Sequence, residues 1–252
     1  MPTPMRSDQV HISGMDARAA RLAKEYHCGY EITAFSYAPM LADAAAFSRV
    51  EAECAGLCSL WLHAPFAELI PCAIDPNVRA NAMVRFRQTA ALAARLGVRR
   101  IVVHGGFIPY VYFPEWYVEQ SVNFWKEVLS DAPDDLLLAV ENVMEPGPEM
   151  LVEIARGVDD PRLGLCLDVG HANTVVSKTP PADWLAPMLP DLRHVHLHDN
   201  HGALDEHLPL GAGTIDFAPI LTMLAAYPDI TITLENQDVT PSLQYLQANG
   251  WL

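Results

Sequence analysis

The feature that most constrains the fold of this chain is a regular alternation of short apolar runs with longer amphipathic stretches. The apolar runs have the length of β-strands and occupy residues 9–13, 29–34, 59–63, 100–104, 136–141, 164–168, 194–198 and 231–235. Helical periodicity is clear in intervening stretches at residues 15–26, 78–96, 114–129 and 217–227. Eight such units along 252 residues predict the α/β class, as a single (β/α)8 TIM barrel in one domain, residues 1–252.

The expected strands share one pattern of faces. Alternate residues of a strand point to opposite sides, so "GLCLDVGH" places Leu163, Leu165 and Leu167 on one face. Cys166 and Asp168 lie on the other face, and aliphatic and polar residues alternate in the same way along "ITITLEN". The aliphatic face suits packing against helices. We therefore expect the second face to point into the barrel and to end in a polar residue.

Six consecutive strands end in a side chain that can bind a metal ion. These strand-end residues are His63, His104, Glu141, Asp168, His196 and Glu235. Any one of them alone could be a simple polar cap of its strand. Because the carboxyl ends of all strands meet at one mouth of a TIM barrel, six of them together predict a metal site there.

Three further residues fit the same site. His171 follows Asp168 by three positions in "LDVGHAN", and "DEHLPLGAG" brings Asp205 and His207 after the seventh strand. This mixture of imidazole and carboxylate groups suits a divalent transition metal such as Zn²⁺, Mn²⁺, Fe²⁺ or Co²⁺ better than Ca²⁺ or Mg²⁺.

The segment "RHVHLHDN" places three histidines on one face of the seventh strand. His196 is the metal-ligand candidate, and His194 is interpreted as a hydrogen-bonded histidine of the barrel core. His198 is expected to touch either substrate or water. Asp199 and Asn200 are expected to shape the following loop. A second possibility is that they hydrogen-bond to a residue that binds the metal and so hold it in place.

Composition narrows the choice of partners and compartment. The net charge is −15 and no basic patch is present, which disfavours a nucleic-acid partner. No run approaches 18 uncharged apolar residues and the first ten residues do not resemble a signal peptide, so neither a membrane span nor export is expected. We interpret the five cysteines as reduced thiols of a cytoplasmic protein; they are Cys28, Cys54, Cys58, Cys72 and Cys166. Homo-oligomerisation remains open.

Taken in order, six short motifs resemble the xylose-isomerase-like TIM-barrel superfamily, which includes endonuclease IV and the sugar isomerases and epimerases. The motifs are "HAPF", "VVHGG", "ENV", "LDVGHAN", "HLHDN" and "DEHLPLGAG". They span nearly the whole chain. The ordered set carries the resemblance, whereas no single motif does.

The resemblance implies a set of metal ligands. In the endonuclease IV branch, three ions would be held by His63, His104 and Glu141; by Glu141, Asp168, His196 and Glu235; and by His171, Asp205 and His207. The isomerase and epimerase branch would use only the second of these sites. The cofactor is therefore expected to be one to three divalent ions, with Zn²⁺ or Mn²⁺ preferred.

Two reactions fit this mouth. The first is isomerisation or epimerisation of a small hydroxy-carbonyl compound such as a sugar. For this reaction the resemblance implies that Glu141 and Glu235 are the acid and base and that His171 orients substrate oxygens. The second is phosphodiester hydrolysis at abasic DNA, for which Phe66 could serve as a wedge in the duplex. A third hypothesis is a barrel that binds a ligand without catalysing a reaction. Because the loops at the mouth are acidic, we favour the small-molecule substrate.

Overall fold

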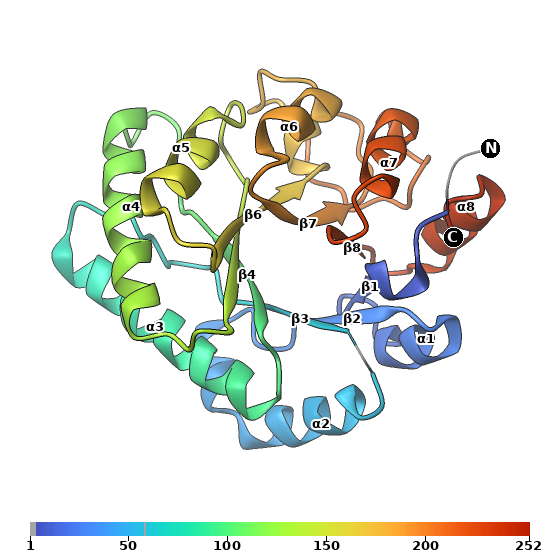
Figure 1. Ribbon diagram of the computed structural model, residues 1–252, viewed down its shortest axis with the longest axis horizontal. Helices are drawn as coiled ribbons and strands as arrows, with labels where there is room; N and C mark the ends of the chain where they lie inside the picture. Colours follow the sequence, from blue (N-terminus) through green and yellow to red (C-terminus); the bar gives the residue numbers. More distant parts are fainter. Residues whose placement is uncertain (1–3, 58) are drawn as a thin grey trace.

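The computed structural model describes residues 4–57 and 59–252, and within them eight parallel strands close into a barrel in sequence order (Figure 1). The strands are β1 (Val10–Ser13), β2 (Gly29–Ile32), β3 (Leu60–His63), β4 (Arg100–His104), β5 (Leu137–Glu141), β6 (Leu163–Asp168), β7 (Leu192–Leu197) and β8 (Thr231–Leu234). Pairing of β1 with both β2 and β8 closes the ring. The expected (β/α)8 TIM barrel is confirmed.

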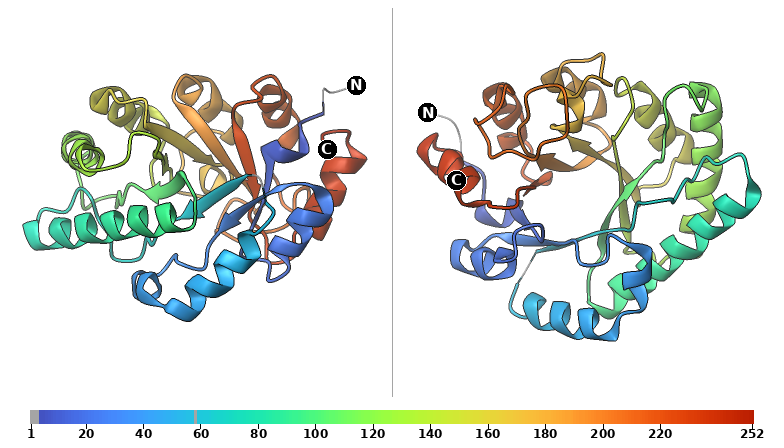
Figure 2. Two further views of the ribbon diagram at one scale, coloured as in Figure 1. Left: turned by 60° about the horizontal axis from the view of Figure 1, so that its bottom comes forward. Right: turned by 180° about the vertical axis from the view of Figure 1, so that it is seen from behind.

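A helix follows each strand and packs on the outside of the barrel, as the rotated views in Figure 2 show. The helices are α1 (Ala19–Tyr26), α2 (Ala44–Cys54), α3 (Pro76–Arg95), α4 (Pro114–Ser130), α5 (Glu149–Val158), α6 (Pro181–Met188), α7 (Phe217–Ala225) and α8 (Thr240–Ala248). Short 3₁₀ turns occur at Ser7–Gln9, Ala38–Ala42 and His171–Asn173. In the described part of the chain, no helix combines the length and the apolar character that crossing a membrane requires.

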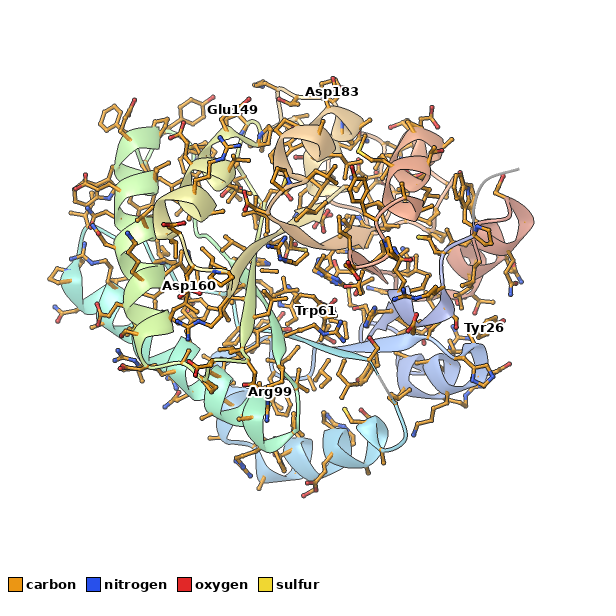
Figure 3. The ribbon with its side chains drawn as sticks, in the orientation of Figure 1. Tyr26, Trp61, Arg99, Glu149, Asp160 and Asp183 are labelled. Carbon is orange, nitrogen blue, oxygen red and sulfur yellow. The ribbon has the colours of Figure 1, made fainter. Side chains whose placement is uncertain are left out.

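The main hydrophobic core lies between the strands and the helices, as the alternation of strand faces predicts. Outward residues such as Leu165, Leu167 and Val195 belong to it and are fully buried. A separate small cluster fills part of the barrel interior and consists of Trp61, Val102, Ala139 and Cys166, with Leu137 against it. Figure 3 shows Trp61 in the middle of the barrel.

The other half of the interior is polar. The Trp61 indole Nε1 donates to Thr231 Oγ1 at 2.9 Å, and its ring stacks on His194 with centroids 4.3 Å apart. His194 is fully buried and hydrogen-bonded, as expected of a core histidine. This polar half forms a fixed support directly below the carboxyl ends of the strands.

A bulge in β7 sets which of its residues point inward. Leu165 pairs with Leu192, whereas the next residue, Cys166, pairs with His194, so Arg193 is the extra residue in the ladder. Room for it comes from Gly164, where a Cβ atom would lie 2.3 Å from the Arg193 Cγ atom. The bulge lets Leu192 belong to the outer core while His194 and His196 face the interior.

The first helix starts later than its periodicity predicts, at Ala19 instead of residue 15. Asp16 is the reason, because its side chain accepts hydrogen bonds from the backbone N–H groups of Arg18 and Val239. These bonds hold the segment after β1 as a turn and tie it to the start of α8. Met15 is thereby left at the barrel mouth, where it lines the main cavity described below.

The cysteines that the structure describes are Cys28, Cys54, Cys72 and Cys166, and all four are free and buried. Burial raises the pKa of the Cys28, Cys72 and Cys166 thiols to about 12 each, so they remain protonated at neutral pH. Cys58 lies outside the described residues.

We predict that Leu221→Ala, on the buried face of α7, lowers the free energy of unfolding by about 2–5 kcal/mol, because it removes contacts and leaves a cavity in the outer core. Val84→Ala on α3 is the control, since this side chain is half exposed and its truncation should cost within about 0.5 kcal/mol. Urea unfolding measures both. Equal losses in the two variants would contradict the packing described here.

Candidate metal centre

A cavity of about 550 Å³ opens at the carboxyl ends of the strands. Its polar lining consists of Thr33, Ser36, His63, His104, Glu141, His171, Asp205, His207 and Glu235. Its apolar lining consists of Met15, Tyr37, Phe66, Val143 and Met144. Seven of the nine residues expected at the metal site therefore face this cavity, and the other two, Asp168 and His196, are fully buried beneath it.

The first cluster joins β3, β4 and β5. The Nε2 atoms of His63 and His104 lie 3.4 and 3.2 Å from the same oxygen, Oε2 of Glu141. That oxygen is buried and accepts no hydrogen bond from described residues. Because the Nδ1 atom of His63 is 2.9 Å from the carbonyl of Ala64, which can only accept, the proton of this ring belongs on Nδ1 and Nε2 keeps its lone pair.

The second cluster surrounds His196. Its Nδ1 atom lies 3.3 Å from Glu141 Oε1, 3.5 Å from Glu235 Oε2 and 3.8 Å from Asp168 Oδ2. These approaches lack hydrogen-bond geometry, so the buried nitrogen has no hydrogen-bond partner among the described residues. Four strand ends, those of β5, β6, β7 and β8, therefore point donor atoms toward one small region.

The third cluster includes residues from two loops. The Nε2 atoms of His171 and His207 lie 3.3 and 3.1 Å from Asp205 Oδ2. The Nδ1 atoms of both rings face backbone carbonyls, those of Asn142 and Glu235, at 2.8 and 3.0 Å. Asp205 Oδ2 can only accept, so both Nε2 atoms donate to it here, and a metal ion bound at this cluster would take the place of these protons.

His198 belongs beside this third cluster. The side chain is fully buried, its Nε2 atom is 3.1 Å from Asp168, and its ring stacks on His207 with centroids 3.9 Å apart. It therefore contacts a ligand candidate instead of bulk water. Gly170 makes room for it, since a Cβ atom there would lie 1.9 Å from the His198 Cε1 atom.

The donor set fits divalent metal ions. Donor atoms bound at about 2.0–2.2 Å to one tetrahedral ion lie roughly 3.3–3.6 Å apart, which is close to the nitrogen–oxygen separations in the first two clusters. Two buried atoms that lack a hydrogen-bond partner, Glu141 Oε2 and His196 Nδ1, belong to these clusters. Buried polar atoms normally have partners, and each of these two atoms faces donor atoms with which it could share a metal ion.

The electrostatics are dominated by the close contact of carboxylates with imidazoles. Burial acts to raise the pKa of Glu141, but His196 and His104 hold it well below its ordinary value. Glu235 has the opposite shift, since burial and the carboxylates around it raise its pKa despite His196. Burial acts to lower the pKa of His207, but Asp205 and Glu235 raise it to about 9.

Asp199 holds the loop that carries Asp205 and His207. Its carboxylate accepts hydrogen bonds from four backbone N–H groups, those of Asn200, Gly211, Gly213 and Ile215. Its backbone pairs with Leu208 in both directions at 2.8 Å. The expectation that this residue shapes the loop agrees with these contacts.

Asn200 fixes the same loop to its neighbour. The Asn200 side chain donates to the carbonyl of Gly170, and its backbone carbonyl accepts from Thr214 N–H. The loops after β6 and β7 are thereby joined, which places His171 within reach of Asp205.

Glu31 on β2 is a buried charged residue that the strand-end pattern does not identify. It is fully buried, and its carboxylate contacts both His194 and His196. A signal was present in the sequence, since Glu31 lies between Gly29 and Thr33 on the inner face of a short strand. It lies before the end of its strand, however, whereas the pattern of candidate ligands involves only residues at the strand ends.

The walls of the cavity are aromatic and aliphatic on the side of β2, β3 and β5. Phe66 stacks on His104 with centroids 4.8 Å apart, and Tyr37 lies 6.0 Å from Phe66. Phe66 thus forms a wall against the first cluster. The residues lining the cavity include neither lysine nor arginine.

The fold and this mouth rich in imidazoles and carboxylates define a TIM barrel with a candidate metal site, and comparison with known proteins identifies its family. The family model of xylose isomerase-like TIM barrels matches residues 21–252. The chain belongs to this family.

Several proteins are similar to this chain. An uncharacterized protein of Methanocaldococcus jannaschii is 31% identical over 193 residues, which cover 73% of this chain and 66% of that protein. A probable endonuclease 4 of Mycobacterium ulcerans is 26% identical over 169 residues, or 62% of this chain and 65% of the relative. The chain thus spans slightly less than two thirds of the length of these curated relatives.

Two solved structures superpose over nearly the whole chain. A protein from Thermus thermophilus, soaked with zinc chloride, is 29% identical with a TM-score of 0.77 and covers 95% of this chain and 97% of its own. A D-tagatose 3-epimerase-like protein is 24% identical with a TM-score of 0.79 and covers 95% of both chains. The second likeness shows the fold alone.

We predict that Asp199→Ala loosens the loop after β7 and lowers the free energy of unfolding by about 2–4 kcal/mol. Four N–H groups would lose their acceptor, and those of Asn200 and Ile215 are buried, so that each costs about 1–3 kcal/mol. Asp183→Ala, at an exposed position of α6 (Figure 3), is the control and should leave stability nearly unchanged.

Hydrogen exchange of residues 199–215 measures the loop directly. Faster exchange confined to this segment is the expected result in Asp199→Ala. Exchange rates equal to those of Asp183→Ala would contradict the role of Asp199.

Proposed function

We propose that this chain is a metal-dependent isomerase or epimerase of a small hydroxy-carbonyl compound, such as a sugar or sugar derivative. The observation that carries the proposal is the cavity itself, which combines a floor of imidazoles and carboxylates with an apolar wall free of cationic side chains. A volume of about 550 Å³ is in the range of pockets that enclose small molecules.

We propose that the principal ion is held by Glu141, Asp168, His196 and Glu235, with Zn²⁺ or Mn²⁺ as the ion. The buried His196 Nδ1, which has no hydrogen-bond partner among the described residues and faces carboxylate oxygens of Glu141, Glu235 and Asp168, supports this assignment. A second ion at His63 and His104, and a third at His171, Asp205 and His207, would use the other two clusters. A divalent ion bound here supplies a Lewis acid that polarises a carbonyl oxygen of the substrate.

Glu141 and Glu235 are proposed as the acid and base. Both line the cavity, whereas Asp168 is buried beneath it. One carboxylate would take the proton from the carbon beside the carbonyl while the C–H electron pair moves toward the carbonyl carbon. The other carboxyl group would return a proton to a carbon of the same substrate, so the net reaction only moves hydrogen.

His171 is proposed to orient the substrate oxygens. Its ring lines the cavity, and its Nδ1–H bond to the Asn142 carbonyl fixes its direction. The wall formed by Tyr37, Phe66 and Met144 excludes water from one side of the bound molecule.

The charge around the mouth favours a small substrate over duplex DNA. In the loops that follow the eight strands, all of which the structure describes, the cationic side chains are Arg18 and Lys178. Arg18 is paired with Asp16 and Asp238, and Lys178 donates to the Val175 carbonyl. Enzymes that hold a duplex need several phosphate contacts, which these loops do not offer.

Phosphodiester hydrolysis in the manner of endonuclease IV is the second candidate. It is favoured by the gathering of all nine candidate ligands at one mouth and by the 26% identity to the probable endonuclease 4 of Mycobacterium ulcerans. The two candidates differ in the partner that the mouth accepts, so one preparation can be tested for both.

For the metal, we predict that the protein as purified, or after incubation with Zn²⁺, binds at least one equivalent, and that the double variant Asp168→Ala/His196→Ala loses it. Zinc should also raise the melting temperature of the native protein, because an ion that binds only the folded state stabilises it by mass action. Elemental analysis and thermal unfolding measure these effects. Equal metal content in both proteins would contradict the assignment.

For the reaction, we predict that the metal-loaded protein exchanges a carbon-bound proton of a hydroxy-ketone with deuterated water, as followed by NMR. Glu235→Gln should abolish the exchange while circular dichroism shows an intact barrel, because the substitution leaves the hydrophobic core unchanged. A panel of ketoses and aldoses then identifies the pair that is interconverted.

The same preparation should bind duplex DNA weakly at physiological salt and should leave an abasic-site duplex uncut with Zn²⁺ or Mn²⁺. Efficient nicking that is lost in Glu141→Ala would reverse the order of the two candidates.

A further inference from the structure

His196 differs from His63, His171 and His207 in what faces its second ring nitrogen. In His63, His171 and His207 that nitrogen faces a backbone carbonyl. In His196 it is the Nε2 atom, and it lies 3.1 and 3.2 Å from the two carboxylate oxygens of Glu31. The Nδ1 atom of the same ring points the opposite way, toward Glu141 and Glu235.

Glu31 is placed where a carboxylate is costly. It comes from β2 and is fully buried, and moving an ionised carboxylate out of water costs several kcal/mol unless donors surround it. Its Oε2 atom accepts from the Thr233 hydroxyl at 2.5 Å and lies 3.0 Å from His194 Nε2. The Nε2 atom of His196 is a third donor beside Oε2, whereas Oε1 has no hydrogen-bond partner among the described residues.

A chain of hydrogen bonds fixes the direction of these protons. The Trp61 indole can only donate, so Thr231 Oγ1 accepts from it. The Thr231 hydroxyl then donates to His194 Nδ1 at 2.6 Å, the alternative acceptor Arg193 O being 3.5 Å away. His194 therefore carries its proton on Nε2, which faces both Thr233 Oγ1 at 2.8 Å and Glu31 Oε2 at 3.0 Å. As a carboxylate, Glu31 can only accept from His196.

We infer that Glu31 is a positioning residue that holds His196 with its proton on Nε2, so that the Nδ1 lone pair is presented to a metal ion. This inference rests on the proposed metal site. A carboxylate behind a metal-bound imidazole fixes the orientation of the ring and increases its basicity, and loss of such a partner typically weakens metal affinity about 10–100-fold.

The variant Glu31→Gln tests the charge with little change of shape. Its affinity for Zn²⁺, measured by competition with a chromophoric chelator, should be about 10–100-fold weaker than that of the native protein. Glu145→Gln is the matched control, because Glu145 is also a buried glutamate but contacts Tyr117 and the backbone of Val143 and Met144. It should bind Zn²⁺ as the native protein does.

A measurement on the native protein keeps the test independent of how well the variant folds. The ¹⁵N shifts of the zinc-loaded protein should show His196 with a protonated Nε2 and a metal-bound Nδ1. A proton on Nδ1, metal bound through Nε2, or equal zinc affinity of the native protein and Glu31→Gln would overturn the inference. Absence of zinc binding by the native protein would instead contradict the proposed function, so the two failures are distinguishable.

Discussion

The structure depends on the burial of several carboxylates and imidazoles inside one closed barrel. Glu31, Glu141 and Asp168 are at most 1% exposed, in surroundings where an isolated charge would be strongly destabilising. Each carboxylate is therefore surrounded by histidine nitrogens. Three of these histidines, His63, His171 and His196, have their second nitrogen fixed by a carbonyl or by Glu31. This arrangement stabilises the charges and directs ring nitrogens and carboxylate oxygens toward the same small regions, as binding of a metal ion requires.

The division of the barrel interior into two halves supports this arrangement. On the side of β3 to β6 the space below the mouth is filled by Trp61, Val102, Ala139 and Cys166. On the side of β7, β8 and β2 it contains the network of His194, Thr231, Thr233 and Glu31. The apolar half supplies close packing, and the polar half orients His196. A rigid floor of this kind keeps ligand atoms in place before an ion binds.

Members of one TIM-barrel family can share ligands and still act on different partners, because the loops at the mouth decide what reaches the ligands. In this chain those loops are poor in cations, and the wall next to the first cluster is made of Phe66, Tyr37 and Met144. Arg18, a cationic residue of these loops, forms ion pairs with Asp16 and Asp238. The surroundings of the ligands, more than the ligands themselves, therefore distinguish the candidate functions.

Much of the fold and of the candidate site could be predicted from the sequence. The alternation of strand and helix patterns predicted the barrel, and the inward phase of each strand end predicted that His63, Glu141 and Glu235 would meet at the cavity, with Asp168 beside His196. These predictions succeed because side-chain periodicity is a local property, and because a closed parallel barrel brings every carboxyl strand end to the same mouth.

Other features were decided only by the tertiary structure. Glu31 and His194 are 163 residues apart in the chain, and their contact exists because closure of the ring sets β2 and β7 across one interior. The bulge at Arg193 and the delayed start of α1 at Ala19 likewise depend on partners from distant segments, Gly164 and Val239. Periodicity specifies which face of a strand points inward. It does not specify which side chains meet there, because that depends on strand register and on the space that neighbouring strands leave.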